Sequence, residues 1–304
     1  MNGDFLAYTR DHAQDPAETV QKNLGELHAR QMALHRARAF WLGELIADQD
    51  ADTLPASDEI RDIWELLSLQ DGEQSCYDKA MQQADQIALC TEISARFPAG
   101  YALAFADLFG AHSTLSADAQ GRVAYVANSY TEQAFMELTG FIKNRRVAYF
   151  HGFEDVCQEV RSGLCEYGIL PIESTLEGSM SGLLRLIELY DLRICALCYV
   201  PTPQSGGTAF ALIRQTLPVQ LPTAQHCMDL LFSPASPADT GRLIGAAALC
   251  SHALLHAATY TGEDNELFRL RFSVSPDTFY PFLLYLLLFC ADVTPIGFYT
   301  ENKK

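Results

Sequence analysis

The sequence has few basic side chains and no hydrophobic run long enough to cross a bilayer. Lys and Arg together number 21 against 38 Asp and Glu, which gives a formal net charge of -17. Proteins that bind nucleic acid or anionic membrane surfaces concentrate Lys and Arg there, so we expect neither partner. The most apolar stretch, residues 279–291, is shorter than the roughly 20 residues that a spanning helix needs. We interpret it as a buried or interface helix.

The sequence also lacks the features of a disulfide-rich secreted protein. Its nine cysteines are scattered through apolar stretches, and the polar opening does not look like a signal peptide. We therefore expect a reduced, cytoplasmic protein. Cys195 and Cys198 have CxxC spacing, but no second pair and no nearby histidines accompany them. This pair is interpreted as core packing, and no metal or cofactor is predicted.

The composition is typical of a globular protein, because 49% of the residues are hydrophobic and 19% are charged. The length of 304 residues allows two or three compact units. Asp15 as an N-cap and Pro16 at the first helical position predict a helix over residues 15–48. Further helices are expected at residues 58–70, 75–97 and 101–109. The turn-rich residues 110–121 then end a helical domain, residues 1–112.

From Arg122 the pattern changes, and short strand-like runs alternate with helical ones. This alternation predicts an α/β lobe over residues 121–216, with a mostly parallel sheet and helices on its faces. After a proline-marked linker, residues 226–304 read in the order βαββαβ, which is the ferredoxin-like arrangement. The predicted fold class is therefore multi-domain α and α/β, with a helical domain, a single α/β lobe and a ferredoxin-like unit.

Three motifs in the lobe resemble one known family. The stretch YGILPIESTLEGSMSGLLRLIELYDLRI, residues 167–194, resembles the Pro-Ile-Glu-Asn-Ser region of the prephenate dehydratases. Residues 122–135, RVAYVANSYTEQAF, resemble the opening strand and helix of that family, and GGTAFALIR, residues 206–214, resembles its Thr-Arg-Phe strand. The last unit resembles the ACT domain that follows in this family, often as a phenylalanine sensor. The whole order resembles the bifunctional chorismate mutase/prephenate dehydratase proteins.

The resemblance implies a set of site residues that would act on prephenate. Thr208 matches the threonine of Thr-Arg-Phe, which would be the acid that helps the substrate hydroxyl to leave as carbon dioxide is lost. Glu173 matches the motif glutamate. The remaining residues would bind substrate: Ser129, Tyr130, Thr131, Ser174 and Thr175. Taken singly, such residues could also cap a helix or begin a strand.

Two departures from the family pattern predict a degenerate dehydratase. The family binds prephenate between two α/β lobes, and the second lobe lies before the Thr-Arg-Phe strand. Here only residues 200–207 occupy that position, whereas a single βαβ unit takes about thirty residues. The motif arginine, the natural partner for a substrate carboxylate, is Ala209.

The resemblance also implies sites outside the lobe. Chorismate mutase chemistry needs several cations around two carboxylates, and the candidates in the helical domain are Arg30, Arg36, Arg38 and Arg61, which solvated helix faces would also explain. Gly241 and Leu243 are the candidate ligand turn of the ACT unit. The ACT unit would also mediate homodimerisation.

Three hypotheses about function stay open on these grounds. The chain is a degenerate or regulatory homologue in phenylalanine biosynthesis, or it is an active mutase or dehydratase that makes phenylpyruvate, water and carbon dioxide from prephenate. The third hypothesis is an ACT-type amino-acid sensor. Prephenate, chorismate and phenylalanine are the small molecules implied.

Overall fold

The computed structural model describes residue 40 and residues 76–110, 115–174, 178–201, 206–234, 237–261, 266–290 and 292–300. The predicted helix at residues 58–70, and all but residue 40 of that at 15–48, lie outside the described residues. Arg30, Arg36, Arg38, Arg61 and Thr175 also lie outside them.

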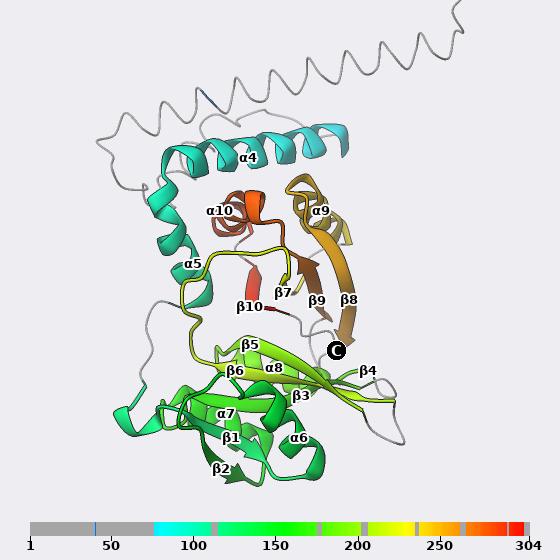
Figure 1. The fold of residues 1–304 in the computed structure, drawn as a ribbon. Helices are drawn as coiled ribbons and strands as arrows, with labels where there is room; N and C mark the ends of the chain where they lie inside the picture. Colours follow the sequence, from blue (N-terminus) through cyan, green and yellow to red (C-terminus); the bar gives the residue numbers. More distant parts are fainter. Residues whose placement is uncertain are drawn as a thin grey trace, which may run out of the picture.

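The described chain begins with two helices that belong to the core of the last unit. They are α4 (Cys76–Arg96) and α5 (Tyr101–Phe109), joined by η1 (Pro98–Gly100), and both were predicted. Both cover α10 (Phe279–Phe289), and α4 also crosses α9 (Pro237–Leu249) (Figure 1). Tyr101 packs edge-on against Tyr280, with ring centroids 5.6 Å apart. One hydrophobic core thus includes residues from both ends of the described chain.

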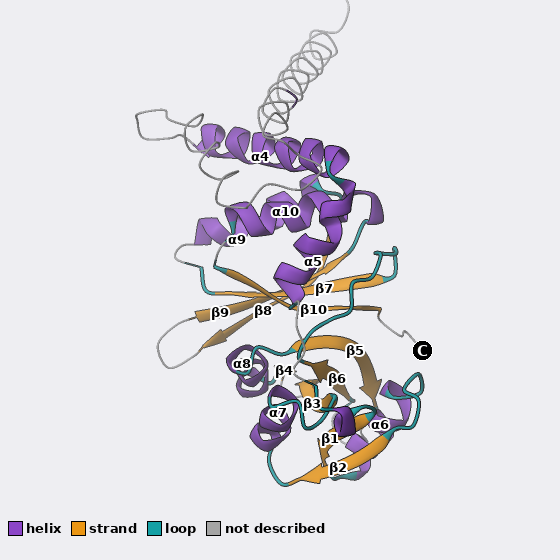
Figure 2. Cartoon of the chain, turned by 90° about the vertical axis from the view of Figure 1, so that its left-hand side faces the viewer, coloured by secondary structure: helices purple, strands orange, loops and turns teal. Residues whose placement is uncertain are grey.

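The α/β lobe contains the predicted alternation of strands and helices. Its strands are β1 (Arg122–Val126), β2 (Arg146–Phe150), β3 (Tyr167–Ser174), β4 (Gly178–Ser179), β5 (Arg193–Val200) and β6 (Thr208–Arg214). Its helices are η2 (Ala117–Ala119), α6 (Ser129–Leu138), α7 (Phe153–Arg161) and α8 (Ser181–Leu189). Helix α6 covers one face of the sheet, and α7 and α8 lie on the other (Figure 2).

The expected mostly parallel sheet is wrong for half of the lobe. Strand β1 pairs in parallel with β2 and β3, but β6 lies antiparallel between β3 and β5. The physical reason is the connection between β5 and β6, residues 201–207. A parallel crossover takes a dozen or more residues, so this short connection joins the two strands as an antiparallel hairpin.

The last unit has the predicted order βαββαβ. It consists of β7 (His226–Phe232), α9, β8 (Ala253–Thr261), β9 (Glu266–Ser273), η3 (Pro276–Thr278), α10 and β10 (Val293–Thr300). The strands form an antiparallel sheet in the order β10-β7-β9-β8, with both helices on one face (Figure 2). Helix α10 is buried, as predicted, because α4 and α5 cover its outer side.

The two sheets join at a single point. Gly297 of β10 pairs in parallel with Ile194 of β5, so the strands form one continuous ten-stranded sheet. A second core lies between α7 and α8 and the helix-free face of the ferredoxin-like sheet, and it includes Leu231 and Ile296 of that sheet. The predicted domain boundaries stay predictions, because this core contains residues from both units.

In the part of the chain that the structure describes, no helix combines the length and apolar character that a membrane span requires.

Candidate functional site

The motif glutamate, Glu173, lies in a bulged strand. Strand β3 continues past Pro171 to Ser174, and its pairing with β6 shifts register between Pro171 and Glu173. The bulge makes Glu173 the cross-strand partner of Ala209. Because paired residues point to the same face, Glu173 lies on the face of Ala211, which packs with the α7 and α8 core.

Thr208 lies on the opposite face of the same sheet. It precedes Phe210 by two residues in β6, and Phe210 packs under α6. Its cross-strand partners are Ser174 and Val200. The structure therefore brings Thr208 and Ser174 together, but it directs Glu173 to the other side.

The predicted substrate loop forms the start of α6. Ser129 and Tyr130 are exposed, whereas Thr131 is fully buried. The backbone N–H groups of Tyr130 and Thr131 donate to Oδ1 of Asn128 at 3.0 and 2.9 Å. Asn128, which the sequence analysis did not single out, thus caps the helix and already uses two of the free N–H groups that an anion would need. An Asn directly before a helical run is the signal that could have found it.

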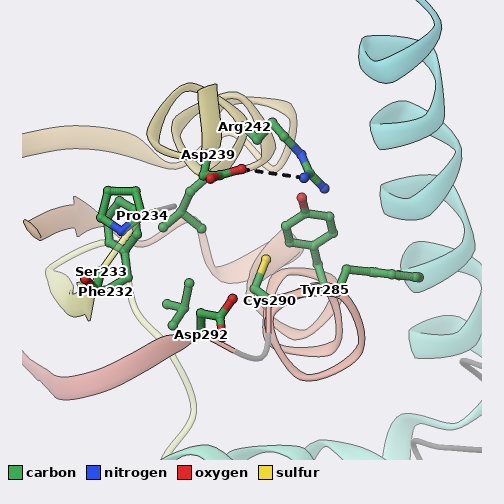
Figure 3. Close-up of a pocket in the computed structure, with 11 residues that line it drawn as sticks. Phe232, Ser233, Pro234, Asp239, Arg242, Tyr285, Cys290 and Asp292 are labelled. Carbon is green, nitrogen blue, oxygen red and sulfur yellow. Dashed lines mark ion pairs between the residues drawn. The ribbon is translucent and has the colours of Figure 1, made fainter. Parts of the chain in front are cut away.

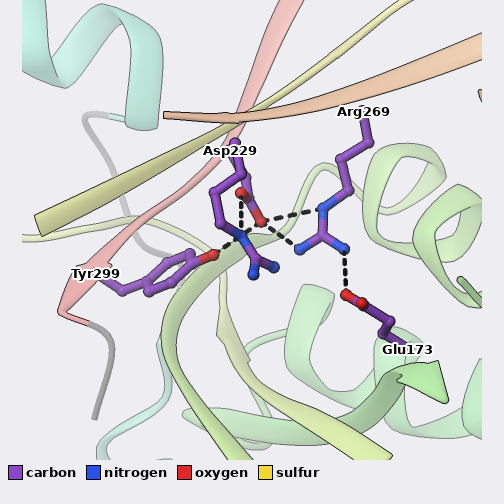
Figure 4. A network of polar contacts seen from close by, with 5 residues as sticks. Glu173, Asp229, Arg269 and Tyr299 are labelled. Carbon is purple, nitrogen blue, oxygen red and sulfur yellow. Dashed lines mark hydrogen bonds and ion pairs between the residues drawn. The ribbon is translucent and has the colours of Figure 1, made fainter. Parts of the chain in front are cut away.

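Glu173 instead faces a buried charged cluster of the ferredoxin-like sheet (Figure 4). Its Oε2 lies 3.8 Å from Nη1 of Arg269 in β9. Arg269 also donates from Nε and Nη2 to Oδ2 of Asp229, with the Nε contact at 3.1 Å. Arg271 donates from Nε to Oδ1 of Asp229 at 2.9 Å, and the Tyr299 hydroxyl donates to Oδ2 at 3.0 Å. We define these five residues as the interface cluster.

Burial and charge pairing act against each other on the titratable groups of the interface cluster. Burial alone would raise the pKa of the Asp229 carboxyl, but the guanidinium groups of Arg269 and Arg271 hold this pKa below its ordinary value. Burial also acts to lower the pKa of Arg269, and Asp229 reverses that effect. Asp229 and both arginines are therefore charged in the folded protein.

The sequence contained a signal for the interface cluster that its analysis missed. Arg269 and Arg271 are two residues apart in the strand LFRLRFSV, so their side chains point to the same face. Asp229 lies inside the equally apolar run MDLLF. Charged residues inside such strands are seldom buried unless they are paired.

A pocket of about 240 Å³ opens beside the predicted ligand turn in the ferredoxin-like unit (Figure 3). Leu243 lines it, but Gly241 is exposed on α9 and does not. Asp239 and Arg242 of α9 line the pocket with their side chains 3.9 Å apart. The other lining residues come from β7, α10, β10 and the positions next to these elements: Phe232, Ser233, Pro234, Tyr285, Phe289, Cys290, Asp292 and Val293.

The CxxC pair packs in the core, as the sequence predicted. Cys198 is buried beneath α6, and the Cys195 thiol donates to the carbonyl oxygen of Leu212 at 3.3 Å. Burial raises the pKa of the Cys195 thiol to about 12, which keeps it protonated. No group of three or more metal-ligating side chains gathers among the described residues.

Comparison with known proteins connects this geometry to one family. The family model described as prephenate dehydratase matches residues 126–205, which include β3 and the residues that follow β5. No curated protein matches the chain.

Solved structures resemble the chain in fold. A prephenate dehydratase from Streptococcus mutans has a TM-score of 0.51 at 16% identity, over 60% of this chain and 99% of that one. GqqA, described as a novel type of quorum-quenching acylase, has a TM-score of 0.48 at 16% identity, over 60% and 95%. A prephenate dehydratase from Arthrobacter aurescens in complex with L-Phe has a TM-score of 0.48 at 11% identity, over 59% and 90%.

The family match confirms the resemblance of the lobe to the prephenate dehydratases, and the Streptococcus mutans structure confirms the expected fold class. At such low identity the structural likeness establishes the fold alone. Residues 126–205 thus match the family model of the prephenate dehydratases, in a chain whose fold is similar to that of a solved prephenate dehydratase.

Proposed function

We propose that this chain does not dehydrate prephenate and acts as a structural or regulatory homologue in phenylalanine biosynthesis. One observation carries the proposal: the two residues expected to do the chemistry, Glu173 and Thr208, lie on opposite faces of one sheet. A group that protonates a leaving hydroxyl must reach it within hydrogen-bond distance while its partners hold the same molecule. A substrate held against one face of the sheet would contact only one of these two side chains.

The surroundings of Glu173 support the same proposal. Ala209, its cross-strand partner, offers no cation to a substrate carboxylate. Arg269 lies 3.8 Å from Glu173 instead, and its side chain is fully buried. The cation nearest to the motif glutamate is therefore already held in protein contacts.

Gly207, directly before β6, lies against a side chain of β5. Gly207 has a φ of +153°, and a Cβ placed there would lie 2.3 Å from the ring of Tyr199. The Tyr199 ring therefore covers the backbone at the start of β6, next to Thr208. We propose that this arrangement takes the place of a second wall and leaves no cleft between two lobes.

A coupled assay with chorismate and with prephenate tests the proposal. We expect no phenylpyruvate from prephenate with the folded protein. Phenylpyruvate formation that is lost in Thr208→Ala and kept in Thr259→Ala, an exposed threonine of β8, would overturn the proposal. Prephenate formed from chorismate would assign mutase activity to the N-terminal region, and Arg30→Ala, Arg36→Ala, Arg38→Ala and Arg61→Ala would then identify its cations.

A second candidate function, binding of an amino acid, is favoured by the pocket beside α9. Asp239 and Asp292 offer carboxylates to an ammonium group, and Arg242 offers a guanidinium to a carboxylate. Tyr285 and Phe289 supply aromatic surface for a side chain. These are the groups that a free aromatic amino acid requires.

Thermal shift with Phe, Tyr and Trp tests this second function. A ligand at a hundred times its Kd stabilises the folded state by about 2.7 kcal/mol, and Arg242→Met should abolish the shift. Arg185→Met on the exposed side of α8 is the control. The absence of a shift with all three amino acids at millimolar concentration would refute amino-acid binding.

We also propose that the chain forms homodimers through the ferredoxin-like unit. Strand β8 is the edge of the sheet, and Leu254 and Leu255 on it are 40% and 47% exposed. An uncovered apolar edge strand favours pairing with another strand. Light scattering after gel filtration should give twice the mass of 33.7 kDa, and a monomer would contradict the proposal.

A further inference from the structure

The interface cluster holds two acidic and two basic side chains, and they come from two units of the fold. Asp229, Arg269 and Arg271 belong to the ferredoxin-like sheet, whereas Glu173 belongs to β3 of the lobe (Figure 4). The side chains of Asp229 and Arg269 have no exposed surface, and that of Arg271 is 10% exposed. Without Glu173 the cluster would carry one uncompensated positive charge.

A buried guanidinium is costly unless a carboxylate balances it. Asp229 is shared by both arginines, because its Oδ2 accepts from Arg269 and its Oδ1 accepts from Arg271. Nη1 of Arg269 is buried and has no hydrogen-bond partner among the described residues. The Glu173 carboxylate lies 3.8 Å from that nitrogen. The Glu173 carboxylate therefore supplies the negative charge beside Nη1 of Arg269.

The bulge in β3 places Glu173 in this position. Ile172 packs in the α7 and α8 core. Strict alternation along β3 would therefore direct the next residue, Glu173, to the other face of the sheet. The register shift between Pro171 and Glu173 instead returns Glu173 to that core face, opposite Ala209. The small side chain at position 209 leaves the approach to Arg269 free of a competing cation.

We infer that Glu173 is a coupling residue, whose carboxylate neutralises Arg269 and thereby makes the lobe and the ferredoxin-like unit unfold together. This inference does not depend on the proposed function, because it concerns stability and needs no substrate. It assigns the motif glutamate a role at the interface between two units. The interface cluster is then a connection between these units in addition to the sheet junction at Gly297 and the shared hydrophobic core.

A double-mutant cycle on the full chain tests the coupling. Glu173→Gln keeps the shape and removes the charge, and Arg269→Met removes the cation while it keeps an unbranched apolar stem. We expect Glu173→Gln to lower the folding equilibrium constant by about tenfold in the wild-type background and by much less beside Arg269→Met. Glu188→Gln on α8, also half-buried, is the matched control and should change little in either background. Equal losses from Glu173→Gln in both backgrounds would overturn the coupling.

Chemical rescue provides a second test that does not require Arg269→Met to fold. Glu173→Ala should be less stable than the wild type, and added formate should restore part of that stability by placing a carboxylate beside Arg269. The wild type and Glu188→Ala should gain no such formate-specific stability over chloride at equal ionic strength. Failure of formate to stabilise Glu173→Ala above these controls would overturn the assignment of the Glu173 charge.

Hydrogen exchange then shows whether the two units separate. In Glu173→Gln we expect faster exchange in β3 and β9, with that of α6 unchanged, because α6 packs on the opposite face. Unchanged exchange in β3 and β9 would overturn the coupling even if stability falls.

Discussion

Replacing Gly297 by alanine should destabilise the junction between the two units. Gly297 is the residue through which β10 pairs with β5, and a Cβ placed there would lie 2.9 Å from the Cβ of Ile194. The same Cβ would lie 3.1 Å from a ring carbon of Tyr299 and 3.3 Å from the carbonyl oxygen of Ile194. The nearest atom is a Cβ fixed to the backbone, so no rotamer change relieves the contact and the strands must move apart.

Overpacking of this kind costs about 1 to 3 kcal/mol. In a chain of a few hundred residues, each kcal/mol lost from the free energy of unfolding lowers Tm by about 2 to 4 °C. Gly297→Ala should therefore melt about 2 to 12 °C below the wild type. Calorimetry of both proteins at one concentration measures the difference. If the two units lose their connection, the unfolding transition of Gly297→Ala should also become broader or divide into two.

Gly241→Ala is the matched control, because the same added methyl meets nothing there. Gly241 is exposed inside α9, and no heavy atom lies within 4 Å of its would-be Cβ. In that position alanine should stabilise the protein by up to about 1 kcal/mol through its higher helix propensity. A Gly297→Ala variant that melts at or above the wild-type temperature, beside a control that behaves as expected, would refute the reasoning.

Three further changes have defined outcomes. Gly207→Ala should lower Tm, because φ is +153° there and the added Cβ would lie 2.3 Å from the Tyr199 ring; an unchanged melt would contradict this close contact. Burial lowers the pKa of the His252 imidazole from 6.5 to about 4, so its contribution to stability is complete above pH 6.5 and is lost as the pH falls toward 4. Urea unfolding between pH 7.0 and 5.5 should therefore show a flatter pH dependence in His252→Gln than in the wild type, and parallel curves would refute this. Asn128→Ala should cost about 1 kcal/mol by chemical denaturation through loss of the α6 cap, whereas Ser129→Ala should stay within about 0.5 kcal/mol, and equal effects would argue against the cap.

The described secondary structure was largely predictable because local periodicity encodes it. The buried strand at β3, the helix at α6 and the order βαββαβ all follow from apolar spacing and turn residues. The length of the β5 to β6 connection also led to the prediction that the chain lacks a second lobe there, which stays a prediction. What the pattern missed was the direction of β6, since alternation of strands and helices favours parallel pairing and only the short connection argues for a hairpin.

The candidate site also combines features that the sequence indicated with one that only the structure gave. The family resemblance named both Thr208 and Ser174, and the structure makes them direct cross-strand neighbours. The resemblance could not place Glu173, since a bulge of one residue moves a side chain from one face of a sheet to the other. No local pattern in β3 indicates that bulge.

The sequence by itself determined the acidic, globular character of the chain, the order of its described elements and its likeness to the prephenate dehydratases, because composition and short-range spacing encode each of these. Only the tertiary structure decided that α4 and α5 cover α10, and that Glu173 faces Arg269, which follows it by almost a hundred residues. Those contacts depend on which faces of the two sheets remain to be covered. Such long-range packing minimises exposed apolar surface and unpaired buried charge over the whole chain, so no single segment specifies it.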